Sequence, residues 1–162
     1  MKAFALSLVV IALSFCEAGC GADTKTHQNE MPPLDILEGN FEQAQCVLEI
    51  EVEDVSQVAK FRSDAGEIGY VQYSVSGAVL ATFKPSEAWE SPPENVVYRF
   101  TQEHDATAIP AVIEGGRYLV FLTHADDSPL LWLIGNGAQF EMSPQLSETI
   151  RRITAQFSAA SF

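Results

Sequence analysis

Basic residues are scarce in this chain. Nine Lys and Arg stand against 22 Asp and Glu, so the formal net charge is −13 at pH 7. A surface of this charge repels nucleic-acid phosphates and anionic lipid headgroups. The composition therefore predicts no nucleic-acid partner and no basic membrane-binding patch, and it is also the ordinary condition of a soluble exported domain.

Cysteine is rare as well, with three residues in the whole chain, which excludes a disulfide-stabilised scaffold. Cys16 and Cys20 lie near the N-terminus, and Cys46 lies within the main body of the chain. Outside the cytoplasm an unpaired thiol is tolerated chiefly when it is buried, and the apolar alternation around Cys46 predicts an inward-facing side chain packed with Leu48 and Val120. The rival hypothesis is a Cys20–Cys46 disulfide in a secreted form without a lipid.

Catalytic and metal-binding motifs are missing too. The sequence has no His-Glu-x-x-His, no Cys-x-x-Cys and no phosphate loop, and no serine has a paired base within a known motif. Gly135-Asn136-Gly137 resembles part of a nucleotide-binding fingerprint, but it leads to Phe140 rather than to a helix and so predicts a turn. We expect no catalytic residue, no metal site and no cofactor.

Apolar runs are too short to cross a bilayer, which takes roughly 20 residues. The run over residues 4–13 follows the basic Lys2 and has the length of the apolar core of an export signal. We therefore expect a signal peptide at residues 1–19. Its removal takes away one lysine and one glutamate, so the net charge does not change.

Cys20 ends this segment in a pattern that resembles the bacterial lipobox, in which small residues precede a cysteine that is diacylated on sulfur. Ala18 and Gly19 fit the pattern, whereas Glu17 departs from it, because an aliphatic residue is preferred there. We expect lipid attachment at Cys20, which makes the membrane a partner through an N-terminal lipid. The alternative is an ordinary cut after Ala18 or Ala22 that leaves a secreted protein.

Both routes place the domain in the cell envelope or outside the cell, at the outer membrane or the periplasmic face if the organism is Gram-negative. Residues 20–33 have little to bury and end in Pro32-Pro33, so beyond the attachment cysteine they predict a flexible tether. Residues 34–162 are then expected to form one domain, which is long enough for a hydrophobic core.

The domain shows the period-two alternation of half-buried strands. Along residues 45–54 the expected inner face consists of Cys46, Leu48, Ile50 and Val52, and the expected outer face is wet and acidic, with Val47, Glu49, Glu51 and Glu53. Further strands are expected over residues 68–83, 96–101, 117–122 and 130–134. Gly77 interrupts the second of these strands, as in a bulge or bend that lets one long strand serve two sides of a barrel. The strand over 117–122 is apolar on both faces and predicts a central or helix-covered position.

Helices are expected on both sides of the strands. Asn40, with Gln43 three residues later, predicts the start of a short helix of one or two turns. Ser143 before Pro144 predicts the cap of a C-terminal helix, whose apolar stripe would lie on the barrel and consists of Leu146, Ile150, Ile153 and Phe157. The predicted fold is mainly β, a small five-stranded OB-like β-barrel with a short N-terminal helix and a C-terminal helix.

A family resemblance covers residues 41–140. The order of a short helix, a long strand, a bent strand ending at Phe83-Lys84-Pro85 and the phrase Gly115-Gly116-Arg117-Tyr118-Leu119-Val120-Phe121 resembles bacterial relatives of the tissue-inhibitor-of-metalloproteinase and netrin-like OB-fold modules. Inhibitors of that family chelate a protease zinc through an N-terminal cysteine within a Cys-x-Cys start. Cys20 is followed by Gly21-Ala22, so the resemblance does not imply that activity here.

Three residues are candidates for a binding loop. Trp89 lies in a proline-rich loop and either plugs a barrel end or projects as a recognition anchor, and we favour the plug. His104 and His124 follow strands that should end at opposite ends of the barrel, so each is expected to be a polar loop residue. Trp132, within an apolar strand, is expected in the core.

Taken together, these patterns predict a non-catalytic binding or interaction module of the cell envelope, with an envelope protein as its partner. The alternative is a small envelope enzyme or protease inhibitor with a site built from the barrel loops around Trp89, His104 and His124.

Overall fold

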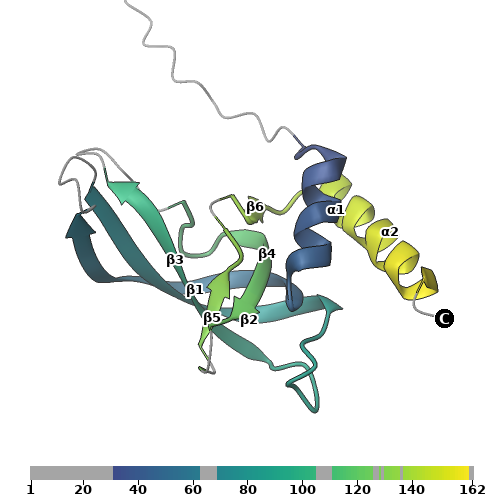
Figure 1. Ribbon diagram of the computed structural model, residues 1–162, viewed down its shortest axis with the longest axis horizontal. Coiled ribbons are helices and arrows are strands. Elements are labelled where there is room, and N and C mark those ends of the chain that lie inside the picture. Colours follow the sequence, from purple (N-terminus) through teal and green to yellow (C-terminus); the bar gives the residue numbers. More distant parts are fainter. Residues whose placement is uncertain are drawn as a thin grey trace, which may run out of the picture.

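The computed structural model describes residues 31–62, 69–104, 111–125, 128, 130–135 and 137–160, without the side chains of His104 and Ala160. Its elements are α1 (Leu34–Gln43), β1 (Cys46–Arg62), β2 (Gly69–Lys84), β3 (Asn95–His104), β4 (Arg117–His124), β5 (Leu131–Leu133), β6 (Gln139–Glu141) and α2 (Pro144–Ala160). Figure 1 shows a strongly curved sheet with the two helices side by side at one end of it. No helix within these ranges is long and apolar enough to span a bilayer.

Five strands close into a barrel. They follow the order β1-β2-β3-β5-β4, and β1 also pairs with β4, which completes the circle. The pairing of β3 with β5 is parallel, at Tyr98 with Leu131 and Arg99 with Trp132, and the other pairings are antiparallel. The mainly β, OB-like barrel is therefore confirmed. Strand β6, which extends the sheet beside β4, was not foreseen.

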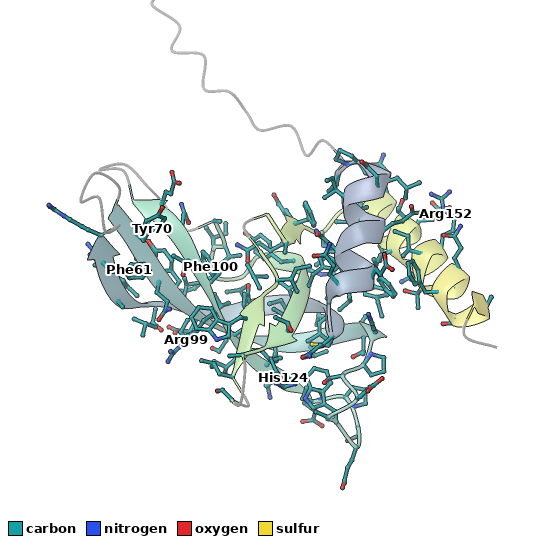
Figure 2. All side chains as sticks on the ribbon, in the orientation of Figure 1. Phe61, Tyr70, Arg99, Phe100, His124 and Arg152 are labelled. Carbon is teal, nitrogen blue, oxygen red and sulfur yellow. The ribbon has the colours of Figure 1, made fainter. Side chains whose placement is uncertain are left out.

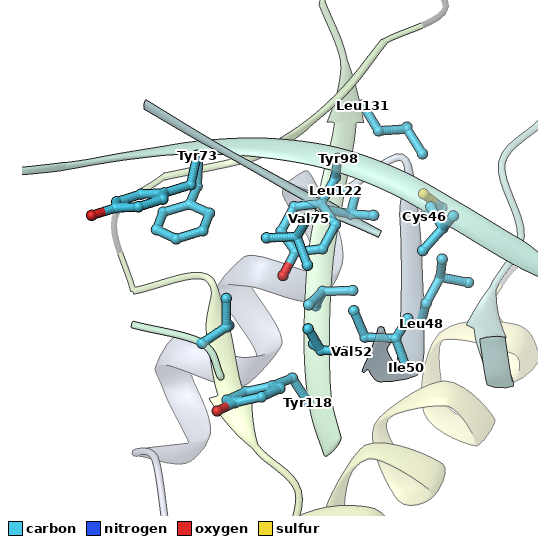
Figure 3. Packing of buried hydrophobic residues seen from close by; sticks show 14 of the residues in the cluster. Cys46, Leu48, Ile50, Val52, Tyr73, Val75, Tyr98, Tyr118, Leu122 and Leu131 are labelled. Carbon is cyan, nitrogen blue, oxygen red and sulfur yellow. The ribbon is translucent and has the colours of Figure 1, made fainter. Parts of the chain in front are cut away.

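The barrel interior is filled by apolar side chains from every strand of the circle. Cys46, Ile50, Val75 and Leu122 are each 0 % exposed, and Figure 3 shows them turned towards one another between the strands. The hydroxyl of Tyr98 donates a hydrogen bond to Gln139 Oε1 at 3.1 Å. This bond satisfies a polar group on a side chain that is otherwise buried in the apolar core. The predicted inward-facing Cys46 is confirmed, and it shares the cluster with Leu48 and Val120 as expected.

A second core lies between the barrel and the helices. It joins Leu37 and Phe41 of α1 to the apolar stripe of α2 and to the outer faces of β1 and β4. Leu119 and Phe121 belong to this second core, whereas Val120 and Leu122 belong to the first. The expectation that the 117–122 strand is covered on both faces is confirmed, and so is the placement of the C-terminal helix on the barrel.

The outer face of β1 was predicted to be wet and acidic, and this is wrong for its first half. Val47 is 0 % exposed and Glu49 only 4 %, because the helices cover them. The Glu49 carboxylate is paired with the guanidinium of Arg117 on β4, since a buried charge requires a partner. Glu51 and Glu53 lie beyond the helices and are exposed, as expected.

The first helix also differs from the prediction. α1 begins at Leu34, so Asn40 lies in its last turn, where the Asn40 carbonyl accepts a hydrogen bond from Ala44 N at 2.9 Å. Burial of Leu37 and Phe41 on one helical face decides the position of this helix, and this burial outweighs a local capping signal. In α2 the predicted cap is confirmed, because Ser143 Oγ accepts a hydrogen bond from Leu146 N at 3.1 Å.

The long hairpin of β1 and β2 extends beyond the barrel together with β3. We call this extension, residues 54–62, 69–76 and 100–104, the arm; it reaches away from the helices in Figure 1. The first and third strands were predicted too short, because polar residues of the arm hide the alternation, whereas the predicted range 68–83 matches β2 to within one residue at each end. Register shifts in β1 leave Glu53 and Val58 unpaired opposite β2, so β1 bends by bulges there.

Gly77 lies opposite the first of these bulges, where the backbones of β1 and β2 approach most closely. A Cβ atom added at Gly77 would lie 2.5 Å from the carbonyl oxygen of Glu51, well inside van der Waals contact. Glycine is therefore required here by the close approach of another backbone. The expected bulge at Gly77 is present, but the extra residue, Glu53, lies on the facing strand β1.

We predict that Gly77→Ala destabilises the domain by about 1–3 kcal/mol, the usual cost of overpacking. The matched control is Gly39→Ala on α1, where nothing lies within 4 Å of an added Cβ and alanine is the better helix former. Urea denaturation should show a lower midpoint for Gly77→Ala and an unchanged or higher midpoint for Gly39→Ala. Equal midpoints for Gly77→Ala and the parent would contradict the close-approach argument.

Candidate functional site

Trp89 closes one end of the barrel. The loop of residues 85–94 connects β2 to β3, and within it Trp89 N donates a hydrogen bond to the carbonyl of Ser86 at 3.1 Å. The indole is partly buried and packs against the barrel core beside Val79. The structure therefore supports the plug rather than the projecting anchor, although the plug is a partial one.

Ser86 and His124 meet at the same end of the barrel. Ser86 Oγ lies 3.3 Å from His124 Nε2, and it also accepts a hydrogen bond from Ala88 N at 3.3 Å. The backbone N–H of His124 donates to Gln45 Oε1 at 2.8 Å. The sequence showed no base paired with any serine, because the two residues lie 38 positions apart and meet only where β1 pairs with both β2 and β4.

A cleft of about 500 Å³ opens beside this pair, which is a volume typical of small-ligand pockets. Its polar lining includes Gln45, Lys84, Ser86, Glu87 and His124. The Lys84 ammonium is already engaged, because it donates to the carbonyls of Phe41 at 2.9 Å and Glu42 at 3.3 Å. Lys84 thus terminates α1, as cations commonly do at helix C-termini.

The Ser86–His124 contact supplies one part of a hydrolytic site. A serine nucleophile also needs a group that orients the base and donors that stabilise an oxyanion. No described residue bonds the second ring nitrogen of His124, and the nearest backbone donor, Ala88 N, is used by Ser86 Oγ itself. Within the described part of the chain, the contact holds loop 85–94 against β4.

His104 does not join this cluster. Its backbone pairs with Gly69 at the far end of β3, whereas His124 lies beside the end of β2 and the start of β1. The prediction that the two histidines occupy opposite ends is confirmed. The acidic residues that follow the two histidines along the chain, Asp105, Asp126 and Asp127, lie outside the described residues. Among the residues that the structure describes, no three His, Cys, Asp or Glu side chains are placed to hold a metal ion.

Cys46 has the chemistry of an inert core residue. Burial raises the pKa of its thiol from the ordinary 9.0 to about 12, a shift that the nearby Lys84 charge partly opposes. The reactive thiolate is therefore essentially absent at neutral pH. Because the folded-state pKa is the higher one, burying this thiol destabilises the fold only as the pH rises from about 9 towards 12.

Trp132 was expected in the core, and this is wrong. It is partly buried and lies outside both hydrophobic clusters. Leu131 points into the barrel, so alternation along the strand turns Trp132 to the outer face. Only the pairing of β5 with β3 and β4 shows which face of this apolar segment is buried.

Two aromatic side chains lie together near the end of the arm, the exposed Phe61 and the partly buried Tyr70. Phe61 on β1 and Tyr70 on β2 are cross-strand partners whose rings stack at a centroid distance of 5.6 Å. Phe61 is 46 % exposed and Val58 is 44 % exposed. We call Val58, Phe61 and Tyr70 the arm patch; Figure 2 shows its two aromatic residues close to the end of the arm. The sequence pattern does not reveal this patch, because strict alternation along the first strand ends at Asp54.

Comparison with known proteins supplies no family for this chain, because no protein-family model and no curated protein matches it.

We predict that Trp89→Ala costs about 2–3 kcal/mol, because it removes a large and partly buried aromatic side chain from the barrel end. The melting temperature should fall by about 5–10 °C. Ile113→Ala is the control, since Ile113 is 59 % exposed and its truncation should change stability by less than about 0.5 kcal/mol. An unchanged melting temperature for Trp89→Ala would contradict the structural plug and make loop 85–94 a candidate recognition site.

Proposed function

We propose that this chain is an exported, lipid-anchored and non-catalytic binding module of the cell envelope. Its lipid is attached at Cys20, its barrel is a rigid support, and the arm patch is its contact surface for an envelope protein. The exposed stack of Phe61 on Tyr70 is the observation that carries the binding part of this proposal.

The arm patch has the chemistry of an interaction site. Exposed aromatic residues on a rigid element bury a large area at little cost in conformational entropy, and Tyr and Arg are enriched in binding hot spots. Phe61, Tyr70 and the exposed Glu103 follow one another across β1, β2 and β3, whereas alternation turns the exposed Lys60 and Arg62 to the other face of β1. A partner with an apolar pocket for the two rings would complement this end of the arm.

Side-chain docking suits the arm better than the addition of a strand. The outer edge of β1 carries Glu53, Asp54, Lys60 and Arg62, and it is bent at Glu53 and Val58. Charges and bulges are the devices that prevent another strand from pairing with a sheet edge. The patch, by contrast, faces away from the sheet and needs no free main-chain groups.

The filled barrel also favours binding by an outer surface. The interior of the circle is occupied by large buried side chains such as Tyr98 and Ile50, so the barrel does not enclose a ligand. The alternative of a small envelope enzyme is favoured by one observation, the Ser86–His124 contact beside the 500 Å³ cleft. We rank it second because the described residues supply neither an oxyanion site nor an orienting partner for the base.

The anchor can be tested in a bacterial host. Cys20→Ala should abolish incorporation of labelled palmitate and shift the protein from the detergent phase to the aqueous phase, because it removes the thiol that would carry the lipid. Cys46→Ala is the matched control and should keep its label, since Cys46 is buried in the barrel. Unchanged membrane partitioning of Cys20→Ala would overturn the lipid assignment and leave the arm patch untouched.

The arm patch can be tested by photo-crosslinking in intact cells. A benzoylphenylalanine placed at position 70 should give an adduct of discrete mass, and Phe61→Ser in the same chain should abolish it. Position 155 on α2 is also exposed and serves as the control, where we expect no such adduct. The same adduct at both positions, or none at position 70, would contradict the proposed contact surface.

A further inference from the structure

Arg99 carries an unsatisfied polar atom on the outer face of the barrel sheet. Its neighbours Tyr98 and Phe100 are both buried in the barrel core, so Arg99 points outward from β3. Its Nε atom is buried and has no hydrogen-bond partner among the described residues. A buried donor left without an acceptor costs about 1–3 kcal/mol, and such an atom in a folded protein calls for an explanation.

The strand register places Arg99 in one row of side chains across five strands. We call it the Arg99 row; in spatial order it consists of Ser56, Ser74, Arg99, Trp132 and Thr123. Neighbours in such a row have Cβ atoms about 4.5–5.5 Å apart, so Ser74, Arg99 and Trp132 lie side by side on the outer face of the sheet. No member carries negative charge, although the chain as a whole has a net charge of −13. Figure 2 shows Arg99 where β3 approaches β5.

The residues around Arg99 are neutral hydrogen-bonding groups, one aromatic ring and the exposed aliphatic side chain of Val97. Ser74 and Trp132 are its immediate partners on β2 and β5, and both are partly buried. The next outward-facing pair of β2 and β3, Gln72 with Thr101, adds an amide and a hydroxyl. Each of these polar side chains both donates and accepts hydrogen bonds. The surface therefore offers a cation, a flat ring and several hydroxyls together.

These groups define the chemistry of a ligand. A guanidinium matches the geometry of a carboxylate through two parallel hydrogen bonds. A single arginine neutralises a single negative charge, and the acidic surface of the protein repels polyanions. The flat face of a tryptophan suits the apolar face of a sugar ring, and the row of hydroxyls suits the hydroxyls of the same sugar.

We propose that the Arg99 row binds an acidic sugar, with the sugar carboxylate on Arg99, its ring against Trp132 and its hydroxyls on the neutral side chains. Tyr70 lies four residues from Ser74 along β2, or about 13 Å. Gln72 lies between the two, so the sugar site borders the arm patch but shares no residue with it.

The protein contains its own reporter for this site. The sequence has two tryptophans, so Trp89→Phe leaves Trp132 as the single fluorophore. We expect D-glucuronate to change Trp132 emission in a saturable manner when titrated into the full chain in a zwitterionic detergent without a sugar headgroup. D-glucose, which differs by the absence of the carboxylate, should bind at least tenfold more weakly, and so should acetate, which lacks the ring.

Variants of arginine test the role of the charge. Arg99→Gln should weaken glucuronate binding at least tenfold, and Arg99→Lys should be intermediate because an ammonium cannot form the bidentate contact. Arg152→Gln on α2 is the matched control, since Arg152 is exposed far from the row, and it should bind as the parent does. Equal binding of glucose, equal binding of acetate, or unchanged binding by Arg99→Gln would each overturn the proposal.

A second measurement does not depend on the folding of any variant. In amide spectra of the parent chain, glucuronate should shift residues 72–76, 99–101 and 132, which carry the Arg99 row and its neighbours. Shifts confined to residues 85–89 and 124 would instead place the sugar in the cleft beside Ser86. That outcome, or no shift at all, would also overturn the assignment.

Discussion

Strand β1 is paired along both edges over residues 47–51, and the rest of the structure depends on this double pairing. Between Cys46 and Glu51 it pairs with β4 on one side, while β2 runs along the other. A strand held on both edges and covered by helices has no route to water on either face. This is why Glu49 is buried and requires Arg117, although Glu51 two residues further along is solvated.

The double pairing ends at one point, and the arm begins there. Val52 makes the last links towards the segment before β4: its N–H donates to the carbonyl of Gly116 at 2.9 Å, and its carbonyl accepts from Gly115 N at 2.8 Å. The bulge at Glu53 follows at once. On the other side of β1, Gly77 admits the Glu51 carbonyl to a distance that a side chain would forbid. The barrel is therefore closed and filled at one end of β1, while the remainder of the strand presents its faces to solvent.

This division of β1 separates the buried core from the surface that we propose for recognition. The buried half carries two hydrophobic clusters back to back, one inside the barrel and one beneath the helices. The arm carries the Phe61–Tyr70 stack, and Arg99 lies on the outer face of β3 next to the start of the arm. A rigid, filled barrel with its polar and aromatic groups on the outside suits binding by a surface. The Ser86–His124 contact lies at the other end and holds loop 85–94 in place.

Short-range patterns predicted much of this fold. Alternation from Cys46 to Val52 identified the inner face of β1, and Ser143-Pro144 identified the start of α2, because both signals depend only on neighbours along the chain. Asn40 misled for the complementary reason. Its capping pattern is local, whereas the position of α1 is decided by burial of Leu37 and Phe41 against α2 and β4.

The sequence by itself determined the alternating strands, the two helices, the lone inward thiol of Cys46 and the acidic surface, since each follows from residue type and spacing. The tertiary structure alone decided which faces are dry and which groups meet. Trp132 and Glu49 each lie in a pattern that allows either face to be buried, and only the closure of β1 on β4 and the packing of the helices chose between them. The same closure brought Ser86 to His124 and placed Arg99 beside Trp132, because cross-strand register joins residues that no local spacing connects.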